Sequence, residues 1–541
     1  MRNTSTILRI LFSLFCIVGS ASCSLVAQQR KQIVIEKADR MRNLKHEGQD
    51  IRRLIGNVVI RHENVIMHCD SAYDYTSQSR FDAFGNVVVF QESSTLYGDT
   101  LHYNSDTKQG RVRGKIVRLV DADATLITNF LDFNTNEQKA NFFGGGIITT
   151  DSAHFSSKRG IYFSRQKLFA FAEDVAYKDK DIVLNTDSLQ YNTRSETIWF
   201  YGPTRVYNDN NYAYGERGWY NRRDNTTELQ QNAFVDNGEQ RVFGERIYYN
   251  KPQGFAEIEK NGCIIDTAQR LTLYADYIEY FEHTEFGEAS KNPLVLSISE
   301  EGDTLYLRAD KLIGNAVRDS VKTDSTMFHL MKGIGDVRFY RRDIQGICDS
   351  MIYHSTDSLL TMYVNPIIWN EENQLSSDKL DILFKNETIS RMYFNGSAFI
   401  CSQEDSIHFN QIRGKEMEGF FNAGRLTKID VKGNGQTAYY VRDKGKLSAV
   451  NKAESSNLTI NLSDNKVSSI MFRDTPKATL FPIQNINIKE VTLKGFAWQN
   501  DKRPKSENEI IPKGLDLDFY IPIENKANLF RDKKKNPAEK L

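Results

Sequence analysis

The chain has 541 residues with 70 basic and 70 acidic side chains, so its formal net charge at pH 7 is zero. A chain without a basic excess lacks the long-range field that draws proteins to nucleic acid, and we expect no nucleic-acid partner. Tyr and Phe, which strands favour, number 25 and 32, whereas Pro occurs only 10 times. This composition is typical of an all-β protein.

Residues 1–27 have the pattern of a secretory signal peptide. Basic side chains flank the start of an apolar stretch over residues 10–18, which is too short to span a membrane. Two cleavage patterns compete, because residues 25–27 suit an ordinary signal peptidase and residues 20–23 resemble a lipoprotein box. We expect export and cleavage after residue 27, with a lipid anchor on Cys23 as the alternative.

A five-residue cassette recurs about every 29 residues from Asp99 onward. It consists of an acidic or polar residue, a small or polar one, an aliphatic one, any residue, and then Tyr or Phe. The copies cover residues 99–103, 129–133, 159–163, 187–191, 216–220, 245–249 and 276–280. A fixed period of this size is typical of a solenoid built from stacked supersecondary units.

Each repeat is predicted to add two antiparallel strands that bend near their middles. Short polar clusters at residues 104–107 and 192–195 indicate hairpin turns. A glycine that permits a bend follows the acidic position by about 15 residues, as at Gly85, Gly114 and Gly202. The expected fold is an elongated all-β jellyroll or solenoid of bent antiparallel strands. A right-handed parallel β-helix is the competing architecture.

The aliphatic residue and the closing aromatic of each cassette lie two positions apart, so they share one face of a strand. Apolar residues such as Leu96 and Leu184 precede the acidic position by three, and a corner at the small residue between them brings both sets inward. We expect the aromatic rings, Tyr220 included, to stack inside. The candidate interior residues are Leu101, Tyr103, Leu131, Phe133, Ile161, Phe163, Leu189, Tyr191, Ile247, Tyr249, Ile278 and Tyr280.

The pattern also divides the chain. Later repeats are expected near Asp378, Lys415 and Asn457. The expected segments are a signal peptide over 1–27, repeats over 35–290, further repeats with inserted loops over 291–500, and a charged, flexible tail over 501–541.

No motif in the sequence indicates catalysis, a cofactor or a metal. After the signal peptide the cysteines are Cys69, Cys263, Cys348 and Cys401, and their spacing matches neither a metal site nor a small disulfide scaffold. Pairing among them stays open for an exported protein. Cys69 and Cys348 stand where other repeats carry a small corner residue, which favours a structural role.

Several segments together resemble the OstA-like/LptA family, in particular the long form found in Bacteroidota. The residues that carry the resemblance are Gly56-Asn57-Val58-Val59-Ile60, Cys69-Asp70-Ser71-Ala72-Tyr73, Phe84-Gly85-Asn86-Val87-Val88, Gly98-Asp99-Thr100-Leu101, Cys348-Asp349-Ser350, Asn365-Pro366-Ile367-Ile368-Trp369 and Lys494-Gly495-Phe496-Ala497-Trp498. The resemblance covers roughly residues 35–510.

This resemblance implies a periplasmic, non-enzymatic protein that carries lipopolysaccharide between the inner and outer membranes. It makes the candidate interior residues lipid-facing, with the acyl chains of lipid A as the bound group. Open strand edges imply partners joined by β-augmentation, among them other transport components and a second copy placed head to tail. A carbohydrate-active β-helix enzyme and a structural envelope or adhesin solenoid are the alternatives.

Overall fold

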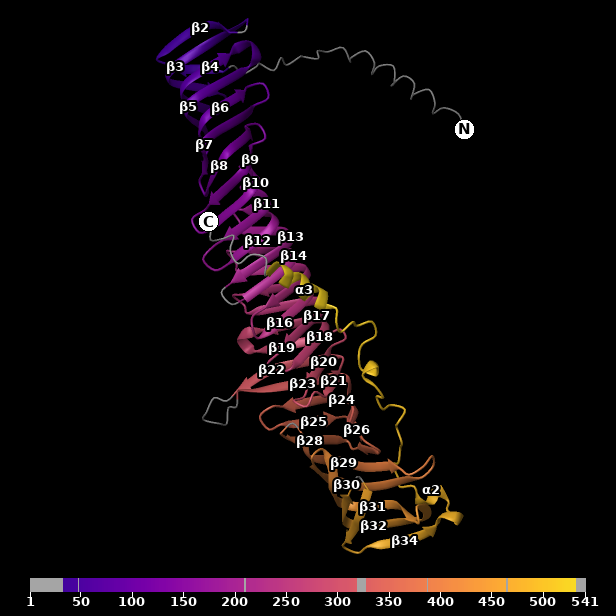
Figure 1. The fold of residues 1–541 in the computed structure, drawn as a ribbon. Coiled ribbons are helices and arrows are strands. Elements are labelled where there is room, and N and C mark those ends of the chain that lie inside the picture. The colour runs from indigo at the N-terminus through magenta and orange to yellow at the C-terminus, as the bar shows by residue number, and fades with distance from the viewer. Residues whose placement is uncertain are drawn as a thin grey trace, which may run out of the picture. The chain divides into compact units, whose positions relative to one another are not determined.

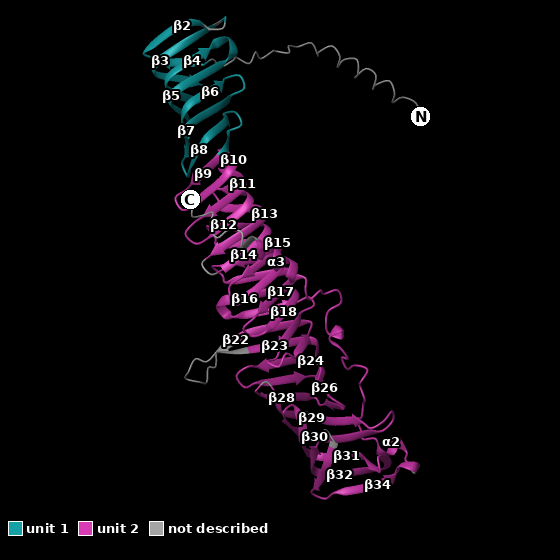
Figure 2. Cartoon of the chain, viewed as in Figure 1, with its two compact units in different colours: residues 1–144 teal, residues 145–541 magenta. Residues whose placement is uncertain are grey.

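The computed structural model describes residues 33–46, 48–208, 211–318, 327–386, 388–463 and 466–531 (Figure 1). The predicted signal peptide, Cys23 and residues 532–541 lie outside the described residues. The chain forms two compact units, residues 1–144 and residues 145–541 (Figure 2).

Unit 1 consists of antiparallel strands, of which the first two both pair with the third, and from the third onward each pairs with the next along the chain. Its elements are β1 (Val34–Lys37), β2 (Arg40–His46), β3 (Gln49–His62), β4 (Val65–Tyr75), the 3-10 turn η1 (Thr76–Gln78), β5 (Arg80–Gln91), β6 (Ser94–Asn104), β7 (Gln109–Asp121) and β8 (Ala124–Asn134). Strand β9 (Lys139–Thr149) contains the division between the units.

Unit 2 repeats the same arrangement and is itself elongated (Figure 2). Its first elements are β10 (His154–Phe163), β11 (Leu168–Lys178), β12 (Val183–Asn192), β13 (Thr197–Asn208), β14 (Asn211–Asn221), β15 (Thr226–Asp236), β16 (Gln240–Asn250), β17 (Phe255–Asp266), β18 (Leu271–Phe281), η2 (Glu282–Thr284), β19 (Phe286–Ser290), β20 (Leu294–Ile298), β21 (Thr304–Arg308) and β22 (Lys311–Arg318). They are followed by β23 (Met327–Arg341), β24 (Ile344–His354), β25 (Leu359–Tyr363), β26 (Ile367–Asn370), β27 (Asn373–Ser376), β28 (Lys379–Lys385), β29 (Thr388–Gln403), β30 (Phe409–Asn422), β31 (Arg425–Asp443), β32 (Lys446–Ser463), β33 (Lys466–Arg473) and β34 (Lys477–Pro482). The predicted fold class, an all-β stack of bent antiparallel strands, is confirmed in each unit.

The strands bend in register, and in most of the strands that lie between cassette strands the bend is a kink of two consecutive residues with positive φ. Gly85 and Asn86, for example, have φ of 75° and 44°. The other pairs are Gly56 with Asn57, Gly144 with Gly145, Glu173 with Asp174, Gln231 with Asn232, Lys260 with Asn261, Lys291 with Asn292, Gly335 with Asp336, Val364 with Asn365, Gly396 with Ser397, Gly433 with Asn434 and Asp474 with Thr475. Gly and Asn are frequent at these positions because they tolerate the left-handed region best.

The first residue of the cassette, or the residue at the same corner in the other repeats, holds the kink of the neighbouring strand. Asn86 donates a side-chain hydrogen bond to Asp70 Oδ2 (2.8 Å), and Asn232 donates one to Glu216 Oε1 (2.8 Å). A Cβ on Gly85 would lie 2.4 Å from Asp70 Oδ2. The contact between carboxylate and kink therefore excludes a side chain at that glycine.

The corners predicted for the later repeats occur where the sequence places them. A Cβ on Gly396 would lie 2.3 Å from Asp378 Oδ2, and one on Gly433 would lie 3.2 Å from Lys415 Cβ. Asn457 donates a hydrogen bond to Asp474 Oδ2 (3.0 Å).

Each kink divides a strand into two halves, and the halves form two arms. We call the half that carries the cassette the cassette arm and the other half the opposite arm. The apolar residues expected in the opposite arm are indeed inside, since Leu96, Leu126 and Leu184 are 6%, 1% and 0% exposed. The cores of both units therefore lie between their two arms.

The cassette read from the sequence is shifted by one residue in β10. There Gly160 and Tyr162 are buried, whereas Ile161 and Phe163 are half-buried and belong to the other face. In β12 the corner residue Thr186 donates to the carbonyl of Ser188 (3.4 Å), and the cassette begins at the next residue, 187. Ser157 makes the equivalent bond to the carbonyl of Arg159 (3.0 Å), so the cassette of β10 begins at residue 158 instead of 159. The inward positions predicted for Ile161 and Phe163 are wrong, and Tyr162 takes the place of Phe163. This spaces the aromatic residues from Phe133 to Tyr249 evenly, about 29 residues apart.

The C-terminal segment of the described chain is packed on unit 2. It contains η3 (Ile483–Asn485), α2 (Ile488–Val491), η4 (Glu507–Glu509) and α3 (Tyr520–Arg531). Ile510 and Ala527 are fully buried against strands β14 to β20. The prediction of a flexible tail from residue 501 is wrong for residues 501–531, because apolar side chains spaced among the charges anchor them. None of the helices in the described part of the chain combines the length and apolarity needed to cross a membrane.

The kink contact predicts different costs for two glycines of nearly equal φ. A Cβ on Gly335 (φ 75°) would lie 2.4 Å from Asp310 Oδ2, whereas a Cβ on Gly424 (φ 74°) would meet nothing within 4 Å. Gly424→Ala should cost about 1–2 kcal/mol for its backbone conformation, and Gly335→Ala about 1–3 kcal/mol more for the clash. Denaturant midpoints of the transition of unit 2 measure both. Equal losses would contradict the proposed role of the carboxylate.

Candidate functional site

Two rows of side chains run along the inner face of the cassette arm in unit 2, because directly paired residues share a face. The row beside the kinks, which we call the floor row, consists of Gly160, Phe171, Leu189, Phe200, Gly218, Leu229, Ile247, Ile258, Ile278, Ala289, Leu312, Gly333 and Met351. The row nearer the hairpin turns, the lip row, consists of Tyr162, Phe169, Tyr191, Ile198, Tyr220, Thr227, Tyr249, Ala256, Tyr280, Gly287, Gly314, Met331 and Tyr353.

The lip row is closed at its N-terminal end. Tyr162 stacks on Phe169 with ring centroids 4.2 Å apart, and Tyr191 lies 4.6 Å from Phe155, a residue of the opposite arm. Tyr162, Phe169 and Tyr191 are accordingly buried. Unit 1 is closed in a similar way, since His62 Nδ1 of its opposite arm lies 2.8 Å from Tyr103 Oη. In these regions side chains of the two arms meet and fill the interior.

Farther along unit 2 the lip row opens to solvent. Tyr220 and Tyr249 are half-buried, and the exposure of Tyr280 and Met331 reaches 41% and 44%. Within the described part of the chain, Tyr249 and Tyr280 make no ring contact with the opposite arm. The floor beneath stays apolar and buried, with Ile247, Ile258 and Ile278.

Small residues alternate with the rings in the open part of the lip row. Thr227 and Ala256 each lie between two tyrosines of the row, and Gly287 follows Tyr280. Gly314 is paired with Met331. A Cβ on Gly314 would meet nothing within 4 Å. In unit 1, by contrast, the ring of Phe133 covers Gly110. The open lip row therefore has gaps between its rings.

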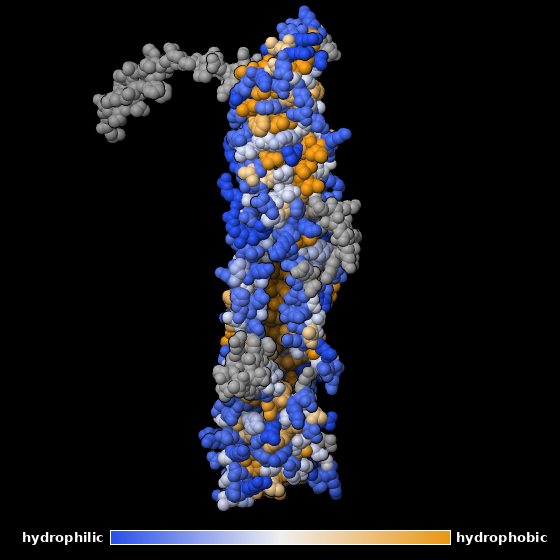
Figure 3. All heavy atoms as spheres, turned by 90° about the vertical axis from the view of Figure 1, so that its left-hand side faces the viewer, coloured by the Kyte–Doolittle hydropathy of each residue, from blue (hydrophilic) through white to orange (hydrophobic). Residues whose placement is uncertain are grey.

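The opposite arm supplies the second wall of this groove. Its inward residues are Val235, Val242, Ile264, Leu273 and Val295, all half-buried. Figure 3 shows a hollow with an apolar floor between hydrophilic margins, at the level of β16 to β23 in Figure 1. The groove is thus a long apolar channel that is open along one side.

The structure places the predicted interior residues in three environments. Leu101, Tyr103, Leu131, Leu189, Tyr191, Ile247 and Ile278 are buried inside their units, whereas Phe133 and Tyr249 are half-buried. Tyr280, expected inside, is exposed at the edge of the groove. Its ring lies in the lip row where the arms no longer meet, so the burial predicted for it is wrong.

The small residues of the lip row were not found from the sequence. The cassette marks every second strand, and Thr227, Ala256 and Gly287 lie on the intervening strands. Gly314 takes the closing position of a cassette over residues 310–314, where a glycine replaces the aromatic residue. Counting back from the hairpin turns gives the positions opposite each aromatic, and this register is the signal that identifies them.

The described residues hold no group of His, Cys, Asp and Glu side chains able to bind a metal ion. Cys69, Cys263, Cys348 and Cys401 are free and buried, and burial raises the pKa of the thiols of Cys69, Cys348 and Cys401 to about 12. Neutral, buried thiols are poor nucleophiles.

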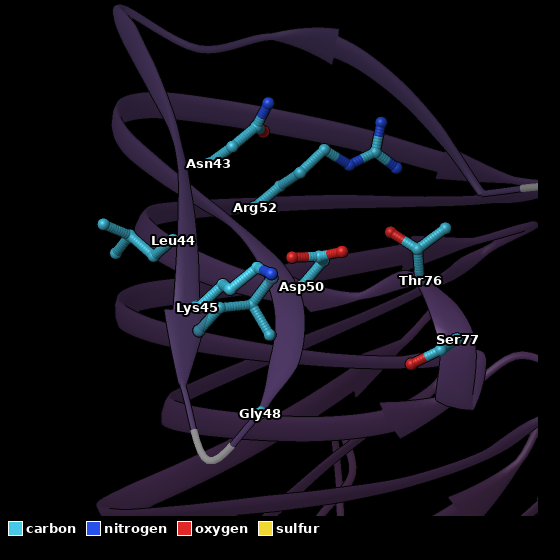
Figure 4. A pocket seen from close by; sticks show the side chains of 9 residues that line it. Asn43, Leu44, Lys45, Gly48, Asp50, Arg52, Thr76 and Ser77 are labelled. Atoms are coloured by element: carbon cyan, nitrogen blue, oxygen red, sulfur yellow. The ribbon is translucent and has the colours of Figure 1, made fainter.

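A polar hollow of about 830 Å³ lies at the start of unit 1 (Figure 4). Asn43, Asp50 and Arg52 of the β2–β3 hairpin line it together with Thr76 and Ser77 of η1. Arg52 Nε donates to Asp74 Oδ2 at 2.9 Å, so its charge is already paired. Leu44 and Ile51 are its apolar lining residues, so the hollow is more polar than the groove in unit 2.

Two neighbouring substitutions test the assignment of faces. Ile247→Asp puts a carboxylate in the buried floor row and should destabilise unit 2 by several kcal/mol. Glu245→Gln alters the exposed first residue of the same cassette and should stay within about 0.5 kcal/mol of the unchanged protein. Thermal melts of both variants decide the matter, and similar losses would show that the faces are assigned wrongly.

Comparison with known proteins agrees with the sequence motifs. Residues 30–187 match the model of the OstA-like protein family. No curated protein matches the chain. One similar solved structure is LptH from Pseudomonas aeruginosa, described as the LptA homologous periplasmic component of the conserved lipopolysaccharide transport device. It is 15% identical, the match covers 25% of this chain and 79% of that one, and the TM-score is 0.14.

A TM-score of 0.14 limits the likeness to LptH to a local one, and it carries no conclusion about function. The family match covers the N-terminal part of the repeats, and the same bent strands continue beyond it. Residues 30–187 are therefore an OstA-like region, as the motifs in the sequence predict.

Proposed function

We propose that this protein is a non-enzymatic, periplasmic carrier or bridge in lipopolysaccharide transport, and that the groove of unit 2 holds acyl chains. The OstA-like match supports the pathway. The observation that supports this binding site is the open lip row. Its aromatic rings are separated by gaps at small residues, and an apolar floor lies beneath them.

The physical need for such a groove is large. Exposing an acyl chain to water costs about 0.8 kcal/mol per CH₂, so a chain of about 13 methylenes costs roughly 10 kcal/mol. From Tyr220 to Met331 the lip row crosses eight paired positions, which at about 4.8 Å per strand extends on the order of 30 Å. That length accommodates extended acyl chains, while the hydrophilic margins leave the sugars in water.

The free edges of the terminal strands support partners that bind by strand addition. In unit 1, β1 and β2 share β3 as their partner, and Val34 and Met41 on them are 53% and 58% exposed. In unit 2, β33 and β34 likewise share β32, with Leu480 63% exposed. Other transport components, or a second copy placed head to tail, are the partners we propose for these edges.

The groove favours lipid carriage over polysaccharide cleavage. Hydrolysis of a glycosidic bond uses a pair of carboxylic acids that face the sugar. The floor row, the lip row and the inward residues of the opposite arm contain no carboxylate. A carbohydrate-active enzyme remains the alternative, and a structural envelope solenoid is the third.

Photocrosslinking in cells tests the proposed site. A benzophenone side chain in place of Tyr280 or Tyr249 should capture lipid A, because both positions belong to the open lip row. The same probe in place of Tyr248 or Glu279, which point to the outer face, should capture much less. Equal capture at all four positions, or release of sugar from a polysaccharide by the purified protein, would contradict the proposal.

Filling a gap in the lip row should block the groove without unfolding the protein. Gly314→Trp places a large ring where a Cβ meets nothing within 4 Å, and we expect at least a fivefold loss of lipid A crosslinking at Tyr280. Ile313→Trp, on the opposite face of the same strand, is the matched control and should leave crosslinking unchanged. Circular dichroism checks that both variants fold. Equal crosslinking in the two variants would exclude this gap as a lipid site.

A further inference from the structure

The C-terminal segment from residue 486 to residue 531, which we call the strap, runs along the outer face of the opposite arm. Figure 1 shows it on the right-hand side of unit 2, whereas Figure 3 views the groove from the left-hand side. Val491 and Leu493 pack on a buried cluster that contains Cys401. Farther along, Arg503 Nε donates to Gln345 Oε1 at 2.8 Å.

The last part of the strap covers an apolar patch on the outer face of β14 to β20. The buried residues of this patch are Tyr212, Tyr214, Phe234, Phe243, Cys263, Tyr274 and Leu294. Ile510 and Ala527 of the strap are 0% exposed against it, and Tyr520 lies 5.2 Å from Phe243 between ring centroids.

The opposite arm is therefore apolar on both faces along the groove. Val242 and Phe243 are neighbours in one strand and point to opposite sides, as do Leu273 and Tyr274. In unit 1 the residue that corresponds to Phe243 is Ile127, which is 42% exposed. An outer apolar face occurs where the arms separate, and the strap is packed against it there.

Polar contacts tie α3 to the place where the groove begins. Tyr212 Oη donates to the carbonyl of Ala527 (2.8 Å), and Arg241 forms an ion pair with Glu524 (2.6 Å). Lys526 pairs with Glu216, the carboxylate that also holds the kink residue Asn232. Burial alone would raise the pKa of Glu216, but the hydrogen bonds from Lys526 and Asn232 lower it below its ordinary value.

We propose that the strap is a releasable brace that holds the groove open. Where the arms separate, the opposite arm has lost contacts across the interior, and the strap replaces them from outside. The strap pairs with no strand in the described part of the chain, so it can detach while the sheet stays intact. Release lets the opposite arm move onto the cassette arm and close the groove. This inference rests on the proposed function only in taking lipid as the groove's occupant.

The native cysteines report release of the strap. Cys263 and Cys401, both 0% exposed, lie under it, whereas Cys69 and Cys348 occupy strand corners away from it. Ala527→Arg inserts a charge beneath α3 and should detach it. Leu529→Arg, at a position 55% exposed on the same helix, is the matched control.

The full mature chain is labelled with a maleimide, and the modified cysteines are located by mass spectrometry. In Ala527→Arg we expect labelling of Cys263 to rise at least tenfold while Cys69 is unchanged. Photocapture of purified lipid A, the probe for the groove, by a benzophenone in place of Tyr280 should fall at least fivefold. Leu529→Arg should match the unchanged protein in both measurements. Two results for Ala527→Arg would overturn the brace: no rise in the labelling of Cys263, or a rise in that labelling with unchanged binding of the probe.

A second variant separates release from unfolding. If Ala527→Arg exposes all four cysteines, the combination Tyr212→Phe and Tyr274→Phe removes the hydrogen bonds to Ala527 and Leu517 without adding a charge. It should raise Cys263 labelling at least threefold over Cys69, and a rise no larger than that of Cys69 would overturn the brace. A probe that fails to bind the unchanged protein would contradict the groove as a lipid site, and Cys263 labelling would still test release of the strap.

Discussion

The contact between the side chain at each strand corner and the kinked backbone of the next strand is the constraint on which the architecture depends. A β-strand alternates its side chains between two faces, so a flat strand cannot bury both Leu184 and Leu189 on one side. A corner at Asp187 breaks that parity, and the paired strand bends beside it at the left-handed kink of Glu173 and Asp174. Each bend then buries apolar residues from both halves of the strand. Repeating the bend about every 29 residues produces, in each unit, two facing arms with an interior between them.

The interior takes two forms, and the side chains of the lip row decide between them. Large rings on successive strands, such as Tyr162 with Phe169, reach across and close the arms. Rings that alternate with small residues, such as Tyr249 with Ala256, cannot fill the same width. The arms then enclose an apolar groove instead of a core. One backbone plan therefore provides a rigid, closed stack and an open stretch without a separate binding domain.

An open stretch creates a problem of stability that the strap answers. Packing across the interior is the main stabilisation of a bent strand, and the strands beside the groove have part of it missing. Their outer faces carry Phe234, Phe243 and Tyr274, which would be an exposed hydrophobic surface if uncovered. The strap buries this surface and restores packing to the same strands. The strap therefore supports the opposite arm from its outer face and leaves the groove on the inner face open.

The sequence by itself determined the repeat, the fold class and most of the inward residues, because these depend on local periodicity and corner chemistry. It also placed the later corners at Asp378, Lys415 and Asn457. Tertiary structure decided the rest. Ser157 shifted one cassette by a residue, pairing across strands set Gly314 opposite Met331, and long-range packing fixed Ala527 of the strap against the outer face of the opposite arm. Such features depend on contacts between residues distant in the chain, and no local sequence pattern shows which apolar side chains will pack together.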